Sequence, residues 1–239
     1  MSATQSSPTE SNPCDLTWFG HATWRLRVGG KSIWIDPFLN ENPKCPIKTT
    51  DVEDCTAVLL THGHFDHVAD AAELANRFGA TLVANYEIAQ WFATKHGVSE
   101  TIGMNIGGRT SVAGIWVKMV PAIHSSSLPD GSYGGLASGY TLETAGTSLY
   151  VAGDTAVFSD MASIAPRIDM AILPIGDLFT MGPEDCVEAI RLLQPRQVVP
   201  SHYDTWPPIS QDAEQWADAV RTQTKSQPLI PTVGIPFSI

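Results

Sequence analysis

The segment THGHFDH, residues 61–67 of this 239-residue chain, follows directly after the apolar run AVLL. It places three imidazoles and a carboxylate, all of them electron-pair donors for divalent metal ions, within seven residues. The segment leaves a buried strand and enters a helix, and side chains at the carboxyl ends of strands face the ligand crevice in α/β proteins. An exposed histidine-rich loop is the alternative, but this spacing favours a metal site.

The four donors of this segment do not all point in one direction. His62 and His64 are two residues apart and can converge on one ion. Asp66 and His67 begin the following helical turn and point elsewhere. Two adjacent metal sites therefore fit the spacing better than one.

Further donors follow other predicted strands. His124 comes after KMVPAI, Asp154 after SLYVAG, and His202 after QVVPS. Taken singly, each has an ordinary structural explanation, as a hydrogen-bonded histidine or a helix N-cap. Together with the first segment they make five histidines and two carboxylates without a thiolate, a set that suits Zn²⁺, Mn²⁺ or Fe²⁺.

The elements that must position these residues repeat one pattern. Strands at 16–19, 23–28 and 32–35 form a meander, and strand-helix units follow, with strands at 57–60 and 81–84 and helices at 68–78 and 86–97. The second half has strands at 114–122, 137–144, 147–153, 168–176 and 196–200 and helices at 182–195 and 212–224. Gly79 is expected to end one helix and Pro183 to start another. The pattern predicts two similar halves, with helices outside packed sheets.

Composition limits the function classes. The hydrophobic fraction of 43% and charged fraction of 16% are typical of a globular protein. No apolar run approaches the ~20 residues of a membrane span, so we expect no membrane association. The net charge of −11 repels nucleic acid and leaves a small molecule as the expected substrate.

Residues 1–14 are polar and rich in Ser, Thr and Pro, so we expect a disordered N-terminal tail followed by one domain over 15–239. The tail lacks the basic start and apolar centre of a secretory signal. Four cysteines without C-x-x-C spacing indicate free thiols, and hence a cytoplasmic protein.

The order H-x-H-x-D-H, then a histidine, the aspartate of GDT and a last histidine resembles the metallo-β-lactamase superfamily. More narrowly, the segments WFGHATWRL, IDPFL, VANYEIAQW, MNIGG, PAIHSSS, AGDTAVFSDM, PIGDLFTMGPEDC and SHYDTWP are similar to a bacterial family of metal-dependent hydrolases related to ascorbate-6-phosphate lactonase. These segments cover most of the chain.

The resemblance implies an α/β fold, a single-domain four-layer αββα sandwich with the site at one edge between the sheets. It further implies two divalent ions, with Zn²⁺ expected and Mn²⁺ or Fe²⁺ as alternatives. His62, His64 and His124 would hold the first ion, and Asp66, His67 and His202 the second. Asp154 would bridge them. Family analogy also implies a homo-oligomer.

The expected reaction is hydrolysis of an ester, lactone, amide or phosphoester bond of a small molecule by a metal-bridging hydroxide. Asp66 and Asp154 are the expected catalytic residues, with Asp66 orienting the hydroxide and receiving its proton. Ser125 and Tyr203 are candidates to protonate the leaving group.

Two other functions stay open. A metal-binding or sensor protein without turnover is one, although structural sites are closed and usually hold a single ion. A diiron oxidoreductase is the other. The flavin-linked diiron branch of the superfamily carries Glu where this chain has His64, and a flavodoxin domain is absent here.

Other residues are candidates to support the site or line its pocket. Asp36 could accept the free N–H of a ligand histidine, or be only a turn residue before Pro37. His21 is a pocket or supporting residue by resemblance, or a turn histidine otherwise. Asp177 and Thr180, in a loop between a strand and a helix, and Tyr203 are the remaining pocket candidates.

Overall fold

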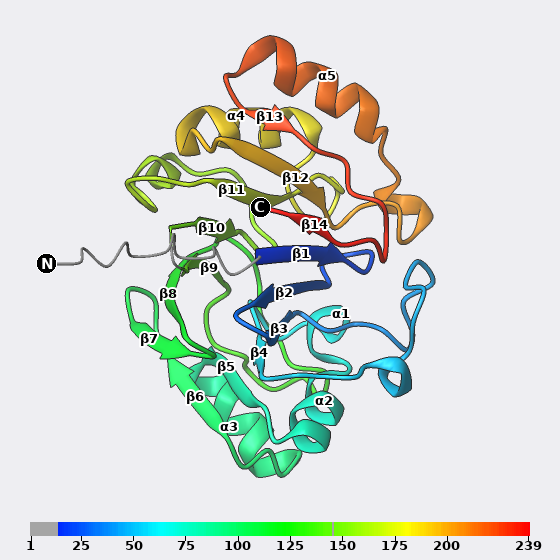
Figure 1. Ribbon diagram of the computed structural model, residues 1–239, viewed down its shortest axis with the longest axis vertical. Helices are drawn as coiled ribbons and strands as arrows, with labels where there is room; N and C mark the ends of the chain where they lie inside the picture. Colours follow the sequence, from blue (N-terminus) through cyan, green and yellow to red (C-terminus); the bar gives the residue numbers. More distant parts are fainter. Residues whose placement is uncertain (1–13, 145) are drawn as a thin grey trace, which may run out of the picture.

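Two seven-stranded sheets pack face to face in the structure, a computed structural model that describes residues 14–144 and 146–239 (Figure 1). The strands of the first sheet lie in the order β14 (Phe237–Ser238), β1 (Cys14–Trp18), β2 (Trp24–Val28), β3 (Lys31–Ile35), β4 (Ala57–Leu59), β5 (Thr81–Asn85) and β6 (Thr101–Met104). Those of the second lie in the order β13 (Gln227–Pro228), β12 (Gln197–Ser201), β11 (Met170–Pro174), β10 (Ser148–Val151), β9 (Ser138–Glu143), β8 (Ile115–Pro121) and β7 (Arg109–Val112).

Both sheets are built in the same way. Strands β1 to β3 and β7 to β10 are antiparallel meanders. Strands β3 to β6 and β10 to β13 are parallel neighbours, which require crossover connections. The expected two similar halves are therefore confirmed by the strand pairing, although no repeat is visible in the sequence.

Helices supply most of the crossovers and cover the outer faces of the sheets. Figure 1 shows α2 (Ala71–Phe78) and α3 (Tyr86–Lys95) at one end of the molecule and α4 (Pro183–Leu193) and α5 (Ala213–Gln223) at the other. The expected terminators are confirmed, because Gly79 caps α2 with a φ of 62° and Pro183 is the first residue of α4. The described part of the chain also contains short 3₁₀ helices at Thr49–Asp51, Ser159–Ser163 and Pro207–Ile209. The expected αββα sandwich is confirmed.

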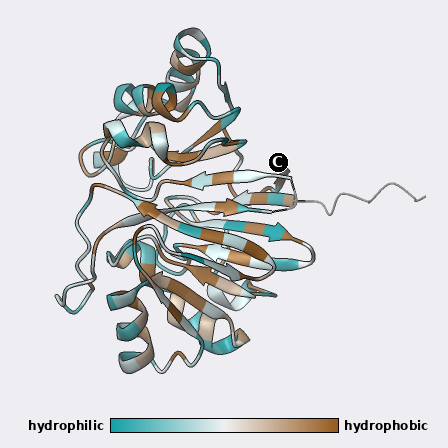
Figure 2. Ribbon diagram, turned by 90° about the vertical axis from the view of Figure 1, so that its left-hand side faces the viewer, coloured by the Kyte–Doolittle hydropathy of each residue, from teal (hydrophilic) through white to brown (hydrophobic). Residues whose placement is uncertain are grey.

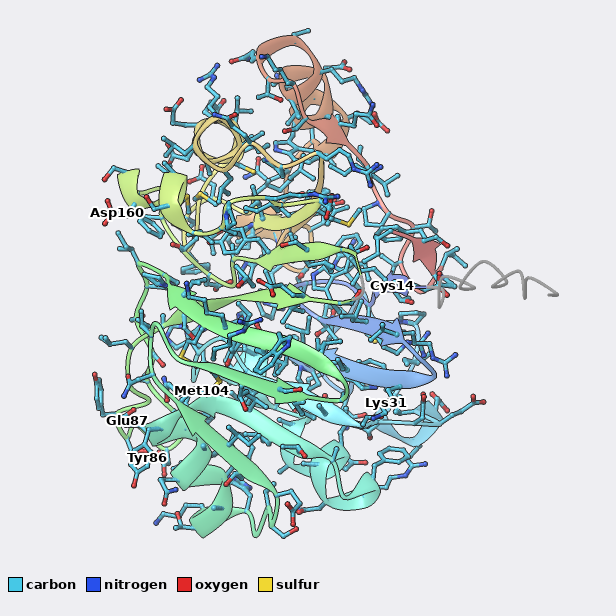
Figure 3. The ribbon with its side chains drawn as sticks, turned by 60° about the vertical axis from the view of Figure 1, so that its left-hand side comes forward. Cys14, Lys31, Tyr86, Glu87, Met104 and Asp160 are labelled. Atoms are coloured by element: carbon cyan, nitrogen blue, oxygen red, sulfur yellow. The ribbon has the colours of Figure 1, made fainter. Side chains whose placement is uncertain are left out.

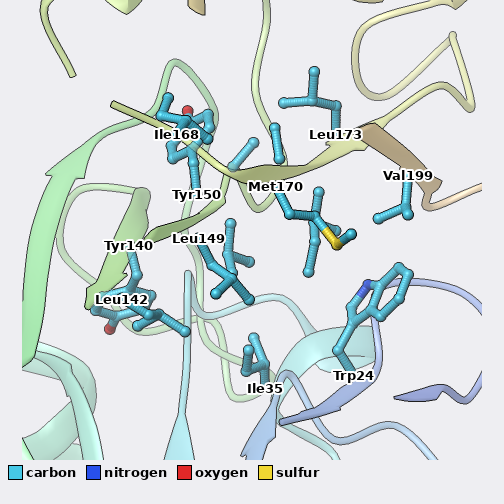
Figure 4. Packing of buried hydrophobic residues seen from close by; sticks show 14 of the residues in the cluster. Trp24, Ile35, Tyr140, Leu142, Leu149, Tyr150, Ile168, Met170, Leu173 and Val199 are labelled. Carbon is cyan, nitrogen blue, oxygen red and sulfur yellow. The ribbon is translucent and has the colours of Figure 1, made fainter. Parts of the chain in front are cut away.

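The core lies between the sheets, and apolar residues concentrate in the strands there (Figure 2). Trp24 and Ile35 of the first sheet pack against Leu149, Met170 and Val199 of the second (Figure 4). Strand β4 alternates as a strand buried on both faces must, since Ala57 and Leu59 belong to this core and Val58 to the cluster under α2 and α3. The packed layers hold the strand ends in fixed positions.

The structure corrects two boundaries. The helix expected over 68–78 is divided into α1 (Phe65–Val68) and α2, because the backbone N–H of Asp70 at the break donates to Pro37 O instead of to a carbonyl of the preceding turn. Residues 1–13 of the expected tail, which was 1–14, lie outside the described residues. Cys14 belongs to β1 (Figure 3). Its carbonyl accepts a hydrogen bond from the N–H of Ile239, the last residue of the sequence.

Sequence reasoning missed the short strands at the sheet edges, β6, β7, β13 and β14. They have two to four residues each, too few to show an alternation of apolar and polar side chains. Among the described helices, none has both the length and the apolar composition needed to cross a bilayer.

Candidate metal centre

The structure brings all seven predicted donors together at one edge of the sandwich. Two of them lie in the loop after β4 and two in α1, and the other three follow β8, β10 and β12. These strands come from both sheets, so neither half alone could assemble the cluster. The seven residues are His62, His64, Asp66, His67, His124, Asp154 and His202.

Three histidines form the first group of donors. His62 Nε2 lies 3.0 Å from His64 Nδ1, which lies 3.3 Å from His124 Nε2. Nitrogen ligands of a tetrahedral zinc ion lie roughly 3.4 Å apart, given Zn–N bonds of about 2.1 Å. The three nitrogens therefore have the spacing that one ion requires.

The second group contains a carboxylate and two imidazoles. Asp66 Oδ2 lies 3.8 Å from His67 Nε2 and 3.7 Å from His202 Nε2. His21 lies close enough to belong to the same group. This second set of donors is distinct from the first, as the spacing of the histidine-rich segment predicts.

A single oxygen of Asp154 lies between the two groups. Asp154 Oδ2 is 3.8 Å from the Nε2 atom of His62 and 3.6 Å from that of His124 in the first group. It is 3.4 Å from His67 Nε2 and 3.1 Å from His202 Nε2 in the second. One carboxylate oxygen is therefore placed to contact two ions.

Several polar atoms of this cluster are buried without a hydrogen-bond partner among the described residues. They are His67 Nε2, both ring nitrogens of His202 and Asp154 Oδ1. Leaving such groups unpaired costs about 1–3 kcal/mol each. Divalent ions would satisfy the inward-facing atoms, so the residues present fit a metal centre.

The charge state of the carboxylates suits that role. Burial alone would raise the pKa of Asp154, but His202 and His67 outweigh it and hold the pKa well below the usual range. The pKa of Asp66 is also lowered, since His67, His202 and His21 overcome the effect of burial. Both carboxylates are thus ionised at neutral pH, as metal ligands must be.

Three site residues adopt left-handed backbone conformations. His21, Asp36 and His202 have φ angles of 55°, 45° and 54°. Such conformations are uncommon outside glycine and cluster at functional sites, where the surrounding structure enforces them. Asp36 and His202 directly follow β3 and β12, so the chain turns sharply at the strand end and aims each side chain at the site.

Asp36 orients two of the ligand histidines. Its Oδ2 atom lies 2.8 Å from His67 Nδ1 and accepts a hydrogen bond of 2.6 Å from the Thr61 hydroxyl. Thr61 Oγ1 in turn lies 3.0 Å from His62 Nδ1. A proton on each Nδ1 leaves each Nε2 free to face the centre. Sequence reasoning gave Thr61 no role, although it directly precedes the first ligand.

His21 holds the carboxylate of the second group. Its Nε2 atom lies 2.8 Å from Asp66 Oδ2 and its Nδ1 atom 2.8 Å from the hydroxyl of Thr205. Burial, reinforced by His202 and His67, lowers the pKa of His21 to about 3, so the ring is neutral. A neutral ring can donate to Asp66 while it accepts from Thr205, which was not anticipated from the sequence.

The donor cluster opens into a cavity of about 550 Å³. His64, Asp66, His124, Asp154 and His202 form its floor, and Ser125 lines it with its hydroxyl 3.2 Å from His64 Nε2. The remaining walls come from residues that the sequence did not single out, namely Phe65, Ser127, Leu128, Pro129, Phe179 and Trp206.

Three residues predicted to support the site or line its pocket are not among those that line this cavity. Tyr203 is buried and stacks on Trp18 with ring centroids 5.2 Å apart, because it follows His202 and points to the opposite side of the chain. The Asp177 carboxylate accepts a hydrogen bond from its neighbour Leu178, and the Thr180 hydroxyl donates to the carbonyl of Met181. Both side chains therefore bond within their own loop, residues 176–182. Phe179 is the one residue of this loop that lines the cavity.

Comparison with known proteins places these features in a family. The model of the family described as beta-lactamase superfamily domain matches residues 31–203. The chain is 46% identical over 208 residues to the UPF0173 metal-dependent hydrolase of Thermus thermophilus, which covers 87% of this chain and 91% of that protein. It is 48% identical over 205 residues to a relative of the same description in Thermococcus kodakarensis, covering 84% of this chain and 89% of that protein.

A solved structure agrees over nearly the whole chain. Igni18, a metallo hydrolase from the archaeon Ignicoccus hospitalis, superposes with a TM-score of 0.85 and 33% sequence identity. The superposition covers 95% of this chain and 98% of that one.

Proposed function

This chain belongs to the family described as beta-lactamase superfamily domain, and its relatives are metal-dependent hydrolases. On that premise we propose that it is a binuclear enzyme that cleaves an ester, lactone, amide or phosphoester bond of a small molecule. One observation carries the proposal. Four ring Nε2 atoms from two groups of donors approach Asp154 Oδ2 to between 3.1 and 3.8 Å. The finer relation to ascorbate-6-phosphate lactonase stays a prediction.

We assign His62, His64 and His124 to one ion, Asp66, His67 and His202 to a second, and Asp154 to both. Two divalent ions there, Zn²⁺ in our proposal with Mn²⁺ or Fe²⁺ as alternatives, would act as Lewis acids and lower the pKa of a water molecule toward 7.

Asp66 is the residue we assign to the attacking water. It lines the cavity, and His21 fixes its Oδ2 atom through a 2.8 Å contact. The second carboxylate oxygen, Oδ1, would orient the water and hold its proton. Of the two hydroxyl groups considered for protonating the leaving group, Ser125 lines the cavity and Tyr203 is buried in the core. Ser125 is therefore the remaining candidate.

The cavity also bears on the alternatives. A structural or sensor site would be closed by protein ligands, whereas this cluster faces a space large enough for a substrate. A diiron oxidoreductase remains disfavoured by His64 within the first group.

The test is metal content and hydrolysis in the same preparations. We expect close to two ions per chain and turnover of at least one substrate in a panel of chromogenic esters, lactones, amides and phosphoesters. Asp154→Ala should lose at least one ion and most activity while it stays folded, because its oxygen contacts both groups. His96→Ala is the matched control, since His96 is an exposed histidine at the end of α3. Full activity in Asp154→Ala would refute the proposed mechanism.

We further propose a cytoplasmic enzyme with a small-molecule substrate. Its four cysteines are free thiols in the structure, which suits a reducing compartment. A homo-oligomer, and the absence of nucleic-acid and membrane partners, stay predictions.

A further inference from the structure

Aromatic and aliphatic side chains form the walls of the cavity above the candidate metal centre. They are Phe65, Leu128, Pro129, Phe179 and Trp206. The volume of about 550 Å³ lies within the range of small-molecule sites. Once the floor is occupied by metal ligands, these walls are what the rest of a substrate would touch.

None of the described residues that line the cavity is Lys or Arg. The segments that surround it, residues 61–70, 122–137, 176–182 and 202–212, contain no Lys or Arg at all. They also contain Asp130, Asp177 and Asp204, whose carboxylates do not line the cavity. A phosphate or carboxylate group of a substrate, held away from the metal centre, would find no cationic side chain there.

One wall is an aromatic surface supported from beneath. Phe65 is 51% exposed and rests edge-on against the buried Phe38, with ring centroids 5.9 Å apart. The Trp206 ring lies 6.2 Å from Phe65 and 6.1 Å from Phe38. Because the three rings support one another, this wall is in place before a ligand arrives.

The loop that carries Phe179 shows backbone strain. Asp177 and Leu178 are consecutive non-glycine residues with φ angles of 61° and 48°. The loop is anchored where Met181 N–H donates to Thr155 O at 3.0 Å. Its tip leaves Leu178 66% and Phe179 56% exposed. A strained backbone and exposed large apolar side chains both cost free energy. A loop that contacts a ligand accounts for both features.

From these observations we infer that the cavity takes an uncharged, apolar part of the substrate, held between the Phe65 and Trp206 rings and Phe179. The inference rests on the proposed hydrolase function and narrows it. It selects substrates that carry an uncharged aromatic or aliphatic group next to the scissile bond, and it disfavours substrates with an anionic group remote from that bond.

The test uses two fluorescent probes that differ by one sulfonate, N-phenyl-1-naphthylamine and 1-anilinonaphthalene-8-sulfonate. Each is titrated into the metal-loaded protein. We expect the neutral probe to bind at least about 10-fold more tightly, because a sulfonate held along the walls loses hydration without gaining a cationic side chain. Equal affinities, tighter binding of the sulfonate or no binding of the neutral probe would overturn the inference.

Phe179→Lys and Phe179→Gln form a matched pair of variants that locates the probes. Both remove the ring from an exposed position, so both should weaken the neutral probe. Only the lysine should strengthen binding of the sulfonate, by about 10-fold relative to the glutamine variant. The quantity compared is the affinity for the sulfonate probe divided by the affinity for the neutral probe. If both variants change this ratio equally, the probes do not bind next to residue 179 and the inference is wrong.

Hydrolysis of a matched pair of esters separates this inference from the proposed function. The pair is 4-nitrophenyl valerate and the 4-nitrophenyl monoester of glutaric acid, which ends in a carboxylate. Preference for the valerate supports both proposals, and preference for the glutarate overturns the inference alone. If neither these esters nor the broader panel is hydrolysed while the probes behave as expected, the proposed function fails and the cavity assignment stands.

Discussion

Asp36 shows how one carboxylate can fix two imidazoles at once. It contacts His67 directly at 2.8 Å and reaches His62 through the Thr61 hydroxyl. Its other oxygen, Oδ1, accepts the Thr61 N–H at 2.8 Å, which holds the start of the histidine-rich segment against β3. The two ligands belong to different groups of the centre, so one side chain sets the tautomers on both sides.

Asp36→Asn should lower metal affinity by about 10–100-fold, because an amide nitrogen cannot accept hydrogen bonds from His67 and Thr61. The measurement is competition with a chromophoric chelator. Asp169→Asn is the control, as Asp169 is also a buried carboxylate, 6% exposed, but precedes β11 at the opposite end of the sheet. An unchanged metal affinity in Asp36→Asn would show that Asp36 serves only as a turn residue.

The loops after β4 and β10 meet so closely that only glycine fits between them. Gly153, the residue before Asp154, has a φ of 63°, and a Cβ atom there would lie 2.7 Å from Thr61 Cβ. Two elements from different sheets thus approach at the point where each delivers a ligand. The missing side chain of Gly153 allows His62 and Asp154 to converge.

Gly153→Ala should lower stability through both strain and overlap. The left-handed conformation costs an alanine roughly 1–2 kcal/mol, and overpacking adds about 1–3 kcal/mol. Gly79→Ala separates the two effects, because its φ is 62° and nothing lies within 4 Å of its added Cβ. Thermal unfolding should show the larger loss for Gly153→Ala, accompanied by loss of metal, and equal losses would contradict the overlap.

In the molecule as a whole, the buried polar donors lie together at one edge, between the two sheets. Asp154 and His67 are almost completely buried, and atoms of both lack hydrogen-bond partners within the described chain. The packed layers of apolar strands keep these groups in place against the cost of their desolvation. Bound cations would remove much of that cost, so metal binding and stability should be coupled.

Removal of metal should lower the melting temperature. At a free ion concentration of 1,000 times Kd, each bound ion contributes about 4 kcal/mol, which corresponds to roughly 8–16 °C per ion for a chain of this length. Calorimetry with and without chelator measures the shift. His96→Ala should show the same shift and Asp154→Ala a smaller one. An equal melting temperature with and without chelator would contradict the coupling of metal binding to stability.

The sequence alone predicted the seven donors, because each comes shortly after a strand or at the start of a helix, and the segment THGHFDH carries four of them at a spacing typical of metal sites. It also predicted the two halves, since the order of strands and helices along the chain limits how sheets can form. Gly79 and Pro183 marked helix ends correctly because their backbone preferences are local.

Only the tertiary structure decided which residues surround the donors. Thr61, Thr205, Phe65, Phe179 and Trp206 are ordinary residue types in loops, and no local pattern marks them. Tyr203 stacks on Trp18 and not against the cavity, because the left-handed conformation of the preceding residue, His202, determines which way it faces. Donor chemistry is local to a residue and its strand, whereas the walls of a cavity depend on which loops the two sheets bring side by side.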